Sequence, residues 1–153
     1  MTVIKNEHLW LWADWPVPEH IRAGTSLRTG GLSLSPYNEL NLAHHVGDDI
    51  DVVNQNREIL INHLQLKSKP VWLNQTHSTN IVAIEKALQN TAADGVYTSN
   101  ANTICTVMTA DCVPILLCDR AATKIAAIHA GWKGICNGIV EAALQLYPVP
   151  EQV

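Results

Sequence analysis

The strongest structural signal in the chain is a pair of short apolar runs followed by a helical pattern. The runs are VPILLC at 113–118 and IAAIH at 125–129, separated by the polar loop DRAATK. Such runs predict two β-strands, and Pro114 indicates a break or an edge position in the first. Apolar residues then recur at helical spacing, at Ile135, Ile139, Ala142 and Leu146. This spacing predicts a helix that begins at Trp132 and is stopped by Pro148.

The preceding residues predict further strands, one helix and a long loop. Strand-like segments lie at 8–15, 21–28, 69–75, 79–85 and 103–109. Residues 48–66 place Val53, Leu60 and Leu64 on one helical face, with Asp48 or Asp49 as the cap. The Asp94-Gly95 pair is a turn signal. Residues 29–48 are rich in Gly, Ser, Pro and Asn, and loops of that length are often functional. Mixed strands and helices in this order indicate an α/β or α+β protein.

Composition and charge exclude several classes of function. The 153 residues are 47% hydrophobic, enough for one packed domain. A net charge of −4 without a basic stripe argues against nucleic acid as a partner. The chain has no run of 18 apolar residues and no secretion signal, so we expect neither a membrane span nor export. In the cytoplasm the four cysteines would be reduced thiols, and none form a C-x-x-C pair.

Three residues with reactive side chains lie where predicted strands end: His77, Cys112 and His129. Strand ends can converge at one edge of a sheet, where active sites are often assembled. Two imidazole nitrogens and one sulfur would leave a fourth position open on a zinc ion, as in catalytic zinc sites. The plainer interpretation is that the cysteine fills the core and the histidines are structural, because their spacing matches no local metal motif.

The remaining cysteines are poorly placed to join these three. Cys118 lies ~20 Å from Cys112 along an extended strand, and Cys105 would point to the opposite face. Cys136 is assigned to packing in the predicted helix. Adjacent side chains point apart, so His44 and His45 are interpreted as structural.

Three other residues have possible roles beside such a site. Lys133 lies where a helix is predicted to begin, and helix N-termini bind anions. Arg28 borders the long loop and could clamp a phosphate or carboxylate, although a loop arginine is usually solvated. Asp111 either orients a ligand histidine or caps a turn.

Six motifs occur in order along the chain: RTGGLS, NLAHHVGDD, NQTHS, ADGVYT, TADCVPILLCD and AAIHAGWKG. Together they resemble the laccase-domain family, first called polyphenol oxidase and now described as purine nucleoside phosphorylase of the bacterial YfiH type. The resemblance implies a layered α/β/β/α fold with mixed sheets and metal ligands at His77, Cys112 and His129. It also implies a zinc-dependent enzyme that phosphorolyses adenosine, inosine and methylthioadenosine and deaminates adenosine. The family commonly has arginine at the position of Lys133, and lysine lacks its two-pronged geometry.

The resemblance covers roughly the N-terminal three-fifths of the family's domain. We therefore expect residues 1–153 to form a single truncated domain with all three metal ligands but an incomplete substrate pocket. One alternative is a cysteine hydrolase acting in peptidoglycan-precursor editing, with Cys112 as nucleophile and His129 or His77 as its base. A copper polyphenol oxidase is less favoured, because Met108 would lie ~13 Å from Cys112 in a strand and could not be an axial ligand. An inactive fragment is the third alternative.

Overall fold

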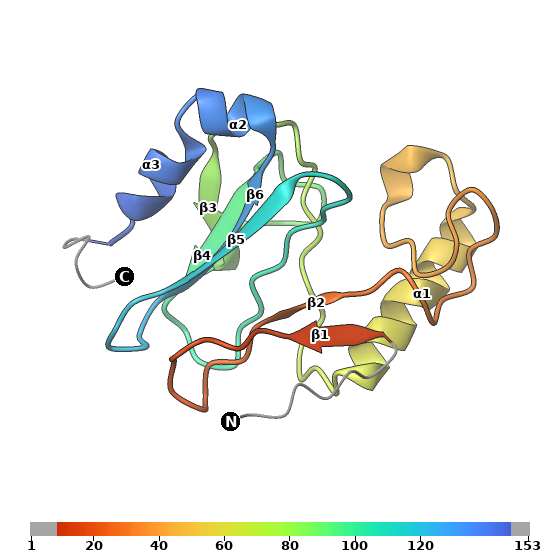
Figure 1. The fold of residues 1–153 in the computed structure, drawn as a ribbon, viewed down its shortest axis with the longest axis horizontal. Helices are drawn as coiled ribbons and strands as arrows, with labels where there is room; N and C mark the ends of the chain where they lie inside the picture. The colour runs from red at the N-terminus through yellow and green to blue at the C-terminus, as the bar shows by residue number, and fades with distance from the viewer. Residues whose placement is uncertain (1–8, 148–153) are drawn as a thin grey trace. The chain divides into compact units, whose positions relative to one another are not determined.

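The computed structural model describes residues 9–147, which fall into two compact units divided between Lys67 and Ser68. The first contains a two-stranded antiparallel sheet and the second a four-stranded mixed sheet (Figure 1). The predicted mixed α/β class is confirmed. No helix among the described residues is long and apolar enough to cross a membrane.

The first unit packs a short hairpin and one long helix around a small core. Strands β1 (Trp10–Trp12) and β2 (Gly24–Ser26) pair antiparallel, and a 3₁₀ turn, η1 (His44–Val46), precedes helix α1 (Ile50–His63). Both strands are shorter than predicted. Asp49 caps α1 by accepting the N–H groups of the second and third residues after it. The predicted apolar face is confirmed, because Val53, Leu60 and Leu64 are all buried.

A buried amide in α1 orders the long loop. The Asn56 side chain is fully buried, and its Nδ2 donates to Ser33 Oγ and to the carbonyls of Glu39 and Asn41. Its Oδ1 accepts the Leu32 N–H at 2.8 Å. One side chain therefore joins α1 to four polar groups of the loop away from water.

The second unit is built on four strands: β3 (Ile81–Ala83), β4 (Gly95–Thr98), β5 (Val113–Cys118) and β6 (Ile125–Ala130). Their order is β3-β4-β6-β5, with β3 and β4 parallel and the other neighbours antiparallel. Figure 1 shows β4, β6 and β5 side by side. Strand β6 is paired on both sides, whereas β5 is an edge strand, which explains how it tolerates Pro114.

Alternation along β6 gives the sheet two apolar faces. Ala126, Ile128 and Ala130 pack against Ile139 and Ala143 of helix α3 (Ile139–Leu144). On the opposite face, Ala127 belongs to a cluster formed with irregular segments and with the 3₁₀ turn η2 (Ile84–Lys86), whose other buried members are Leu73, Ile84, Ala87, Ala93 and Val96. Both sides of β6 are therefore buried, as its uninterrupted apolar run requires.

In the second unit, three predicted elements differ from the structure. The expected helix from Trp132 is two helices, α2 (Trp132–Cys136) and α3, because Gly138 between them adopts a left-handed φ of +94°. The predicted strand at 103–109 has no strand pairing. The segment 69–75 contributes only an isolated bridge between Asn74 and Ala92. The predicted stop at Pro148 lies outside the described residues.

Candidate metal centre

His77, Cys112 and His129 converge in the second unit. One ligand atom from each lies within 4.8 Å of the others. Cys112 Sγ is 3.7 Å from His77 Nε2, and the two imidazole rings meet edge-on with centroids 4.8 Å apart. Among residues 9–147 this is the one group of three or more His, Cys, Asp or Glu side chains with such spacing. The three side chains therefore form a cluster rather than separate packing positions.

The three residues reach this cluster from different local structures. His129 lies on β6 and is only 4% exposed. Cys112 immediately precedes β5, so it lies just beyond the first pair of the β5–β6 ladder, Val113 with Ala130. His77 lies in an irregular segment and has a φ of +59°, a left-handed conformation uncommon outside glycine. Such a conformation persists only where surrounding contacts hold it.

Asp94 supplies those contacts. Its side chain is fully buried, and Oδ1 accepts the backbone N–H of His77 at 3.0 Å and Nδ1–H of His129 at 2.8 Å. Its Oδ2 accepts the N–H and hydroxyl of Ser78 at 2.6 and 2.7 Å and the N–H of Thr76 at 3.2 Å. Because a carboxylate only accepts, the His129 proton lies on Nδ1 and the lone pair lies on Nε2, the nitrogen left for a metal.

The charge of Asp94 follows from these contacts. Burial raises the pKa of Asp94, but hydrogen bonds from Ser78, His129 and Thr76 outweigh burial and hold the pKa below its ordinary value. The carboxylate is therefore ionised at neutral pH. An anion beside the His129 ring fixes its orientation and increases its basicity as a ligand.

The pKa of the Cys112 thiol is shifted in the opposite direction, toward the protonated form. Burial raises its pKa above the ordinary value, and the charge and hydrogen bond of Asp111, together with the charge of Asp94, raise it further. A nucleophilic cysteine needs a lowered pKa, so this environment does not suit a free thiolate. A coordinated cation would deprotonate the thiol outright.

Gly131 leaves the space in which the cluster forms. A Cβ on this residue would lie 2.6 Å from His77 Cδ2 and 3.0 Å from Cys112 Sγ. Its φ of −70° is open to any residue, so glycine is required here for space and not for backbone conformation. This requirement explains the glycine that follows His129 and Ala130 in the sequence.

The donor set fits a zinc-like ion. A tetrahedral zinc with N and S ligands holds them about 3.6 Å apart, given Zn–N of about 2.0–2.1 Å and Zn–S of about 2.3 Å. The 3.7 Å separation of His77 Nε2 and Cys112 Sγ matches that geometry. Three protein donors leave a fourth position for water or substrate.

The three residues predicted to have roles beside the site, Asp111, Lys133 and Arg28, lie in different surroundings. Asp111 is exposed and acts on Cys112, whereas the carboxylate that orients a histidine is Asp94, which the sequence interpretation treated only as part of a turn. Lys133 is exposed in the first turn of α2, with Nζ 5.6 Å from the centroid of the Trp132 ring. In the first unit, Arg28 donates through Nε and Nη2 to the Asn38 carbonyl.

The other cysteines lie outside the cluster. Cys105 packs against the core, where burial raises its pKa to about 12. Cys118 is buried at the end of β5. Cys136 was assigned to packing, and that was wrong: it is exposed, because α2 turns this position away from the core that α3 covers.

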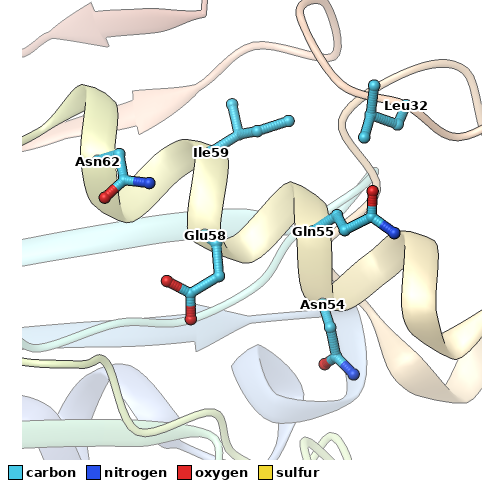
Figure 2. Close-up of a pocket in the computed structure, with 6 residues that line it drawn as sticks. All are labelled: Leu32, Asn54, Gln55, Glu58, Ile59 and Asn62. Carbon is cyan, nitrogen blue, oxygen red and sulfur yellow. The ribbon is translucent and has the colours of Figure 1, made fainter.

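A separate pocket of about 380 Å³ lies in the first unit beside α1 (Figure 2). Its lining residues are Leu32, Asn54, Gln55, Glu58, Ile59 and Asn62. The lining consists of neutral amides, two apolar side chains and one carboxylate, without a histidine or cysteine. It lacks the reactive groups that the cluster brings together.

The fold and the cluster together define a mixed α/β protein with a candidate three-donor metal site. The family described as multi-copper polyphenol oxidoreductase laccase matches residues 22–151 by its sequence profile. The chain belongs to this family.

Relatives with similar sequences are named for a nucleoside reaction. The chain is 43% identical over 141 residues to a Haemophilus influenzae protein named purine nucleoside phosphorylase, covering 92% of this chain and 58% of that protein. It is 44% identical over 135 residues to purine nucleoside phosphorylase YfiH of Escherichia coli, covering 88% of this chain and 56% of that protein. The chain thus spans less than two thirds of these relatives.

Solved structures share the fold. The Neisseria meningitidis protein NMB0706 matches with a TM-score of 0.84 at 43% identity, covering 92% of this chain and 58% of that one. YlmD from Geobacillus stearothermophilus matches with a TM-score of 0.85 at 30% identity, covering 99% of this chain and 60% of that one.

Proposed function

We propose that this chain carries the metal centre of a zinc-dependent purine nucleoside phosphorylase. Its substrates would be phosphate with adenosine, inosine or methylthioadenosine, and adenosine would also be deaminated. The observation that carries the proposal is the convergence of His77, Cys112 and His129 within 4.8 Å. The names of the similar proteins supply the reaction. We further propose that the chain is part of one laccase-like domain that works in the cytoplasm.

The residues of the site would have separate roles in binding the metal and the substrate. His77 Nε2, Cys112 Sγ and His129 Nε2 would hold the ion, and Asp94 would keep the His129 proton on Nδ1. Zinc bound there would supply a water with a pKa of about 7 and a Lewis acid for the deamination. Lys133 is proposed to contact phosphate. Arg28 is proposed as an anion contact within the first unit, where its Nε and Nη2 would have to exchange the Asn38 carbonyl for the anion.

Two alternatives predict different metal and thiol behaviour. A cysteine hydrolase would contain no metal and would need a reactive Cys112 thiolate, which the raised pKa opposes. A polyphenol oxidase would contain copper. Elemental analysis of the purified protein separates these two from zinc, and zinc should protect Cys112 from alkylation until a chelator is added.

The activity test uses adenosine and phosphate, with products separated by chromatography. Adenine formed with ribose 1-phosphate reports phosphorolysis, and inosine together with the hypoxanthine formed from it reports deamination. Cys112→Ser should lose bound zinc and both activities, whereas Cys136→Ser, on the exposed face of α2, should retain them. Equal loss in both variants would contradict the proposal, and thermal melts of each variant exclude a general loss of fold.

The Haemophilus influenzae relative, of which the chain spans 58%, is the parallel sample. We propose that the 153-residue chain binds zinc as well as the longer relative does but turns nucleosides over poorly. Residues that hold the substrate in position raise the reaction rate by orders of magnitude, and we expect the substrate pocket of this chain to be incomplete. Comparable turnover per zinc would refute that part. If neither protein contained zinc after purification, the proposed function would be refuted.

A further inference from the structure

A side chain joins two irregular segments that lead to the metal cluster. Gln75 Nε2 donates to the Met108 carbonyl at 2.7 Å, and the Met108 N–H donates to Gln75 Oε1 at 2.7 Å. The amide presents a donor and an acceptor side by side, so it engages one residue's backbone much as a neighbouring strand would. Both residues are half-buried, and neither belongs to a strand.

The two hydrogen bonds between Gln75 and Met108 lie close in sequence to two residues of the cluster. Gln75 lies two residues before His77, and Met108 lies four residues before Cys112. Asp94 joins the His77 backbone to the His129 ring, and the β5–β6 ladder holds His129 beside the segment that begins at Val113. The Gln75 amide ties the remaining pair, the His77 segment to the Cys112 segment.

The 103–109 segment shows why such a tie is needed. Its Cys105 and Val107 pack against the core cluster, yet the segment pairs with no strand. Without ladder bonds it can slide along an apolar surface, because hydrophobic contacts are not directional. A metal site requires its ligands to be held within about 0.5 Å of the productive geometry. Two hydrogen bonds to Met108 supply the missing directional restraint.

We propose that Gln75 is a positioning residue that sets the separation of His77 and Cys112 and thereby the metal affinity. The inference rests on the proposed metal function of the cluster. It assigns no contact between Gln75 and the ion. Removing a direct hydrogen-bond partner of a ligating residue lowers metal affinity by about 10- to 100-fold, and because Gln75 acts one residue further out, we expect the lower end of that range.

The chain offers a matched control in the same unit. Gln89 also engages backbone with both amide atoms: Oε1 accepts the Trp72 N–H at 3.0 Å and Nε2 donates to the Pro70 carbonyl at 3.1 Å. The Gln89 amide restrains the 70–72 segment, which carries no cluster residue. Gln75→Met and Gln89→Met therefore each remove two backbone hydrogen bonds while keeping a side chain of similar length.

The experiment titrates cobalt(II) into wild type and both variants at fixed pH, alongside urea unfolding of each metal-free protein. We expect Gln75→Met to bind cobalt about 10-fold more weakly, with a weaker thiolate-to-cobalt charge-transfer band. Gln89→Met should lose stability but keep the wild-type affinity and band. Gln75→Glu retains the acceptor for the Met108 N–H, and it should fold and show the same direction of change if the Met variant does not fold.

Each outcome decides a separate point. Wild-type affinity and spectrum in both Gln75 variants would overturn the inference while leaving the metal site intact. Equal weakening in the Gln75 and Gln89 variants would also overturn it, because general destabilisation would then be the cause. No cobalt or zinc binding by wild type would refute the proposed function itself, and the inference with it.

Discussion

Replacing Asp94 with asparagine tests the arrangement most directly. The substitution keeps the shape of the side chain but turns one acceptor oxygen into a donor NH₂ group. If the NH₂ takes the place of Oδ2, it opposes the backbone N–H groups of Ser78 and Thr76. If it takes the place of Oδ1, it opposes the His77 N–H, and His129 can be satisfied only by moving its proton to Nε2. That tautomer has no lone pair left for a metal.

The size of the effect follows from the bonds lost. Hydrogen bonds to charged groups contribute about 1.5–3 kcal/mol each, so two opposed donors cost about 3–6 kcal/mol. This is a large part of the roughly 5–15 kcal/mol by which a domain is stable. We therefore expect Asp94→Asn to lower the free energy of unfolding by about 3 kcal/mol or more, and to weaken metal binding by about 10- to 100-fold.

Asp119 provides the control for this experiment. Its carboxylate accepts two backbone N–H groups and a hydroxyl, from Thr123 and Lys124, in the loop between β5 and β6. Urea unfolding of the metal-free proteins and a metal titration are measured for both variants. Asp119→Asn should lose stability with unchanged metal affinity. If metal-free Asp94→Asn is unfolded, its affinity is obtained from the metal concentration that restores its circular dichroism. Wild-type affinity in Asp94→Asn would refute the reasoning.

Further predictions concern two glycines and one titration. Gly131→Ala should weaken metal binding with little effect on the metal-free fold beyond local repacking, because its Cβ would press on the His77 ring and the Cys112 sulfur; unchanged affinity in a cobalt titration would contradict this. Gly138→Ala should cost about 1–2 kcal/mol in urea unfolding, because a left-handed φ of +94° disfavours a side chain, and it should leave metal affinity unchanged. Burial raises the pKa of Asp119, but hydrogen bonds from Thr123 and Lys124 hold it below its ordinary value of 3.8. Because the folded pKa is lower than the unfolded one, this carboxylate stabilises the fold above about pH 4 and loses that contribution as pH falls through the folded pKa. The difference in unfolding free energy between wild type and Asp119→Asn should therefore be constant near neutral pH and disappear in acid.

The sequence predicted the positions that local pattern controls. Strands β5 and β6 and helix α1 were recognisable because apolar periodicity and the Asp49 cap act over a few residues. His77, Cys112 and His129 were identified as a set because each was predicted to lie at a strand end. In the structure this is correct for Cys112, whereas His77 lies in an irregular segment and His129 lies within β6. Their convergence depended on pairing between distant segments, which residue spacing alone does not specify.

Asp94 and Gln75 were missed for a shared reason. Each acts through backbone groups of residues far along the chain, and a backbone N–H has no signature in the sequence. The Asp94-Gly95 pair was interpreted as a turn, although the aspartate is buried and Gly95 begins β4. The break at Gly138 had a visible signal, a glycine within the helical pattern, which commonly marks a helix end.

The central position of β6 has a kinetic consequence for the cluster. His129 belongs to a strand hydrogen-bonded on both sides, so exposing it requires two ladders to open. His77 and Cys112 lie outside any ladder, so exposing them requires only that the local contacts of Asp94 and Gln75 open, which costs less free energy than opening the core. We therefore expect the amides of β6 to exchange hydrogen most slowly. A departing metal ion would then leave His77 and Cys112 first and His129 last, and an arriving ion would be captured in the reverse order.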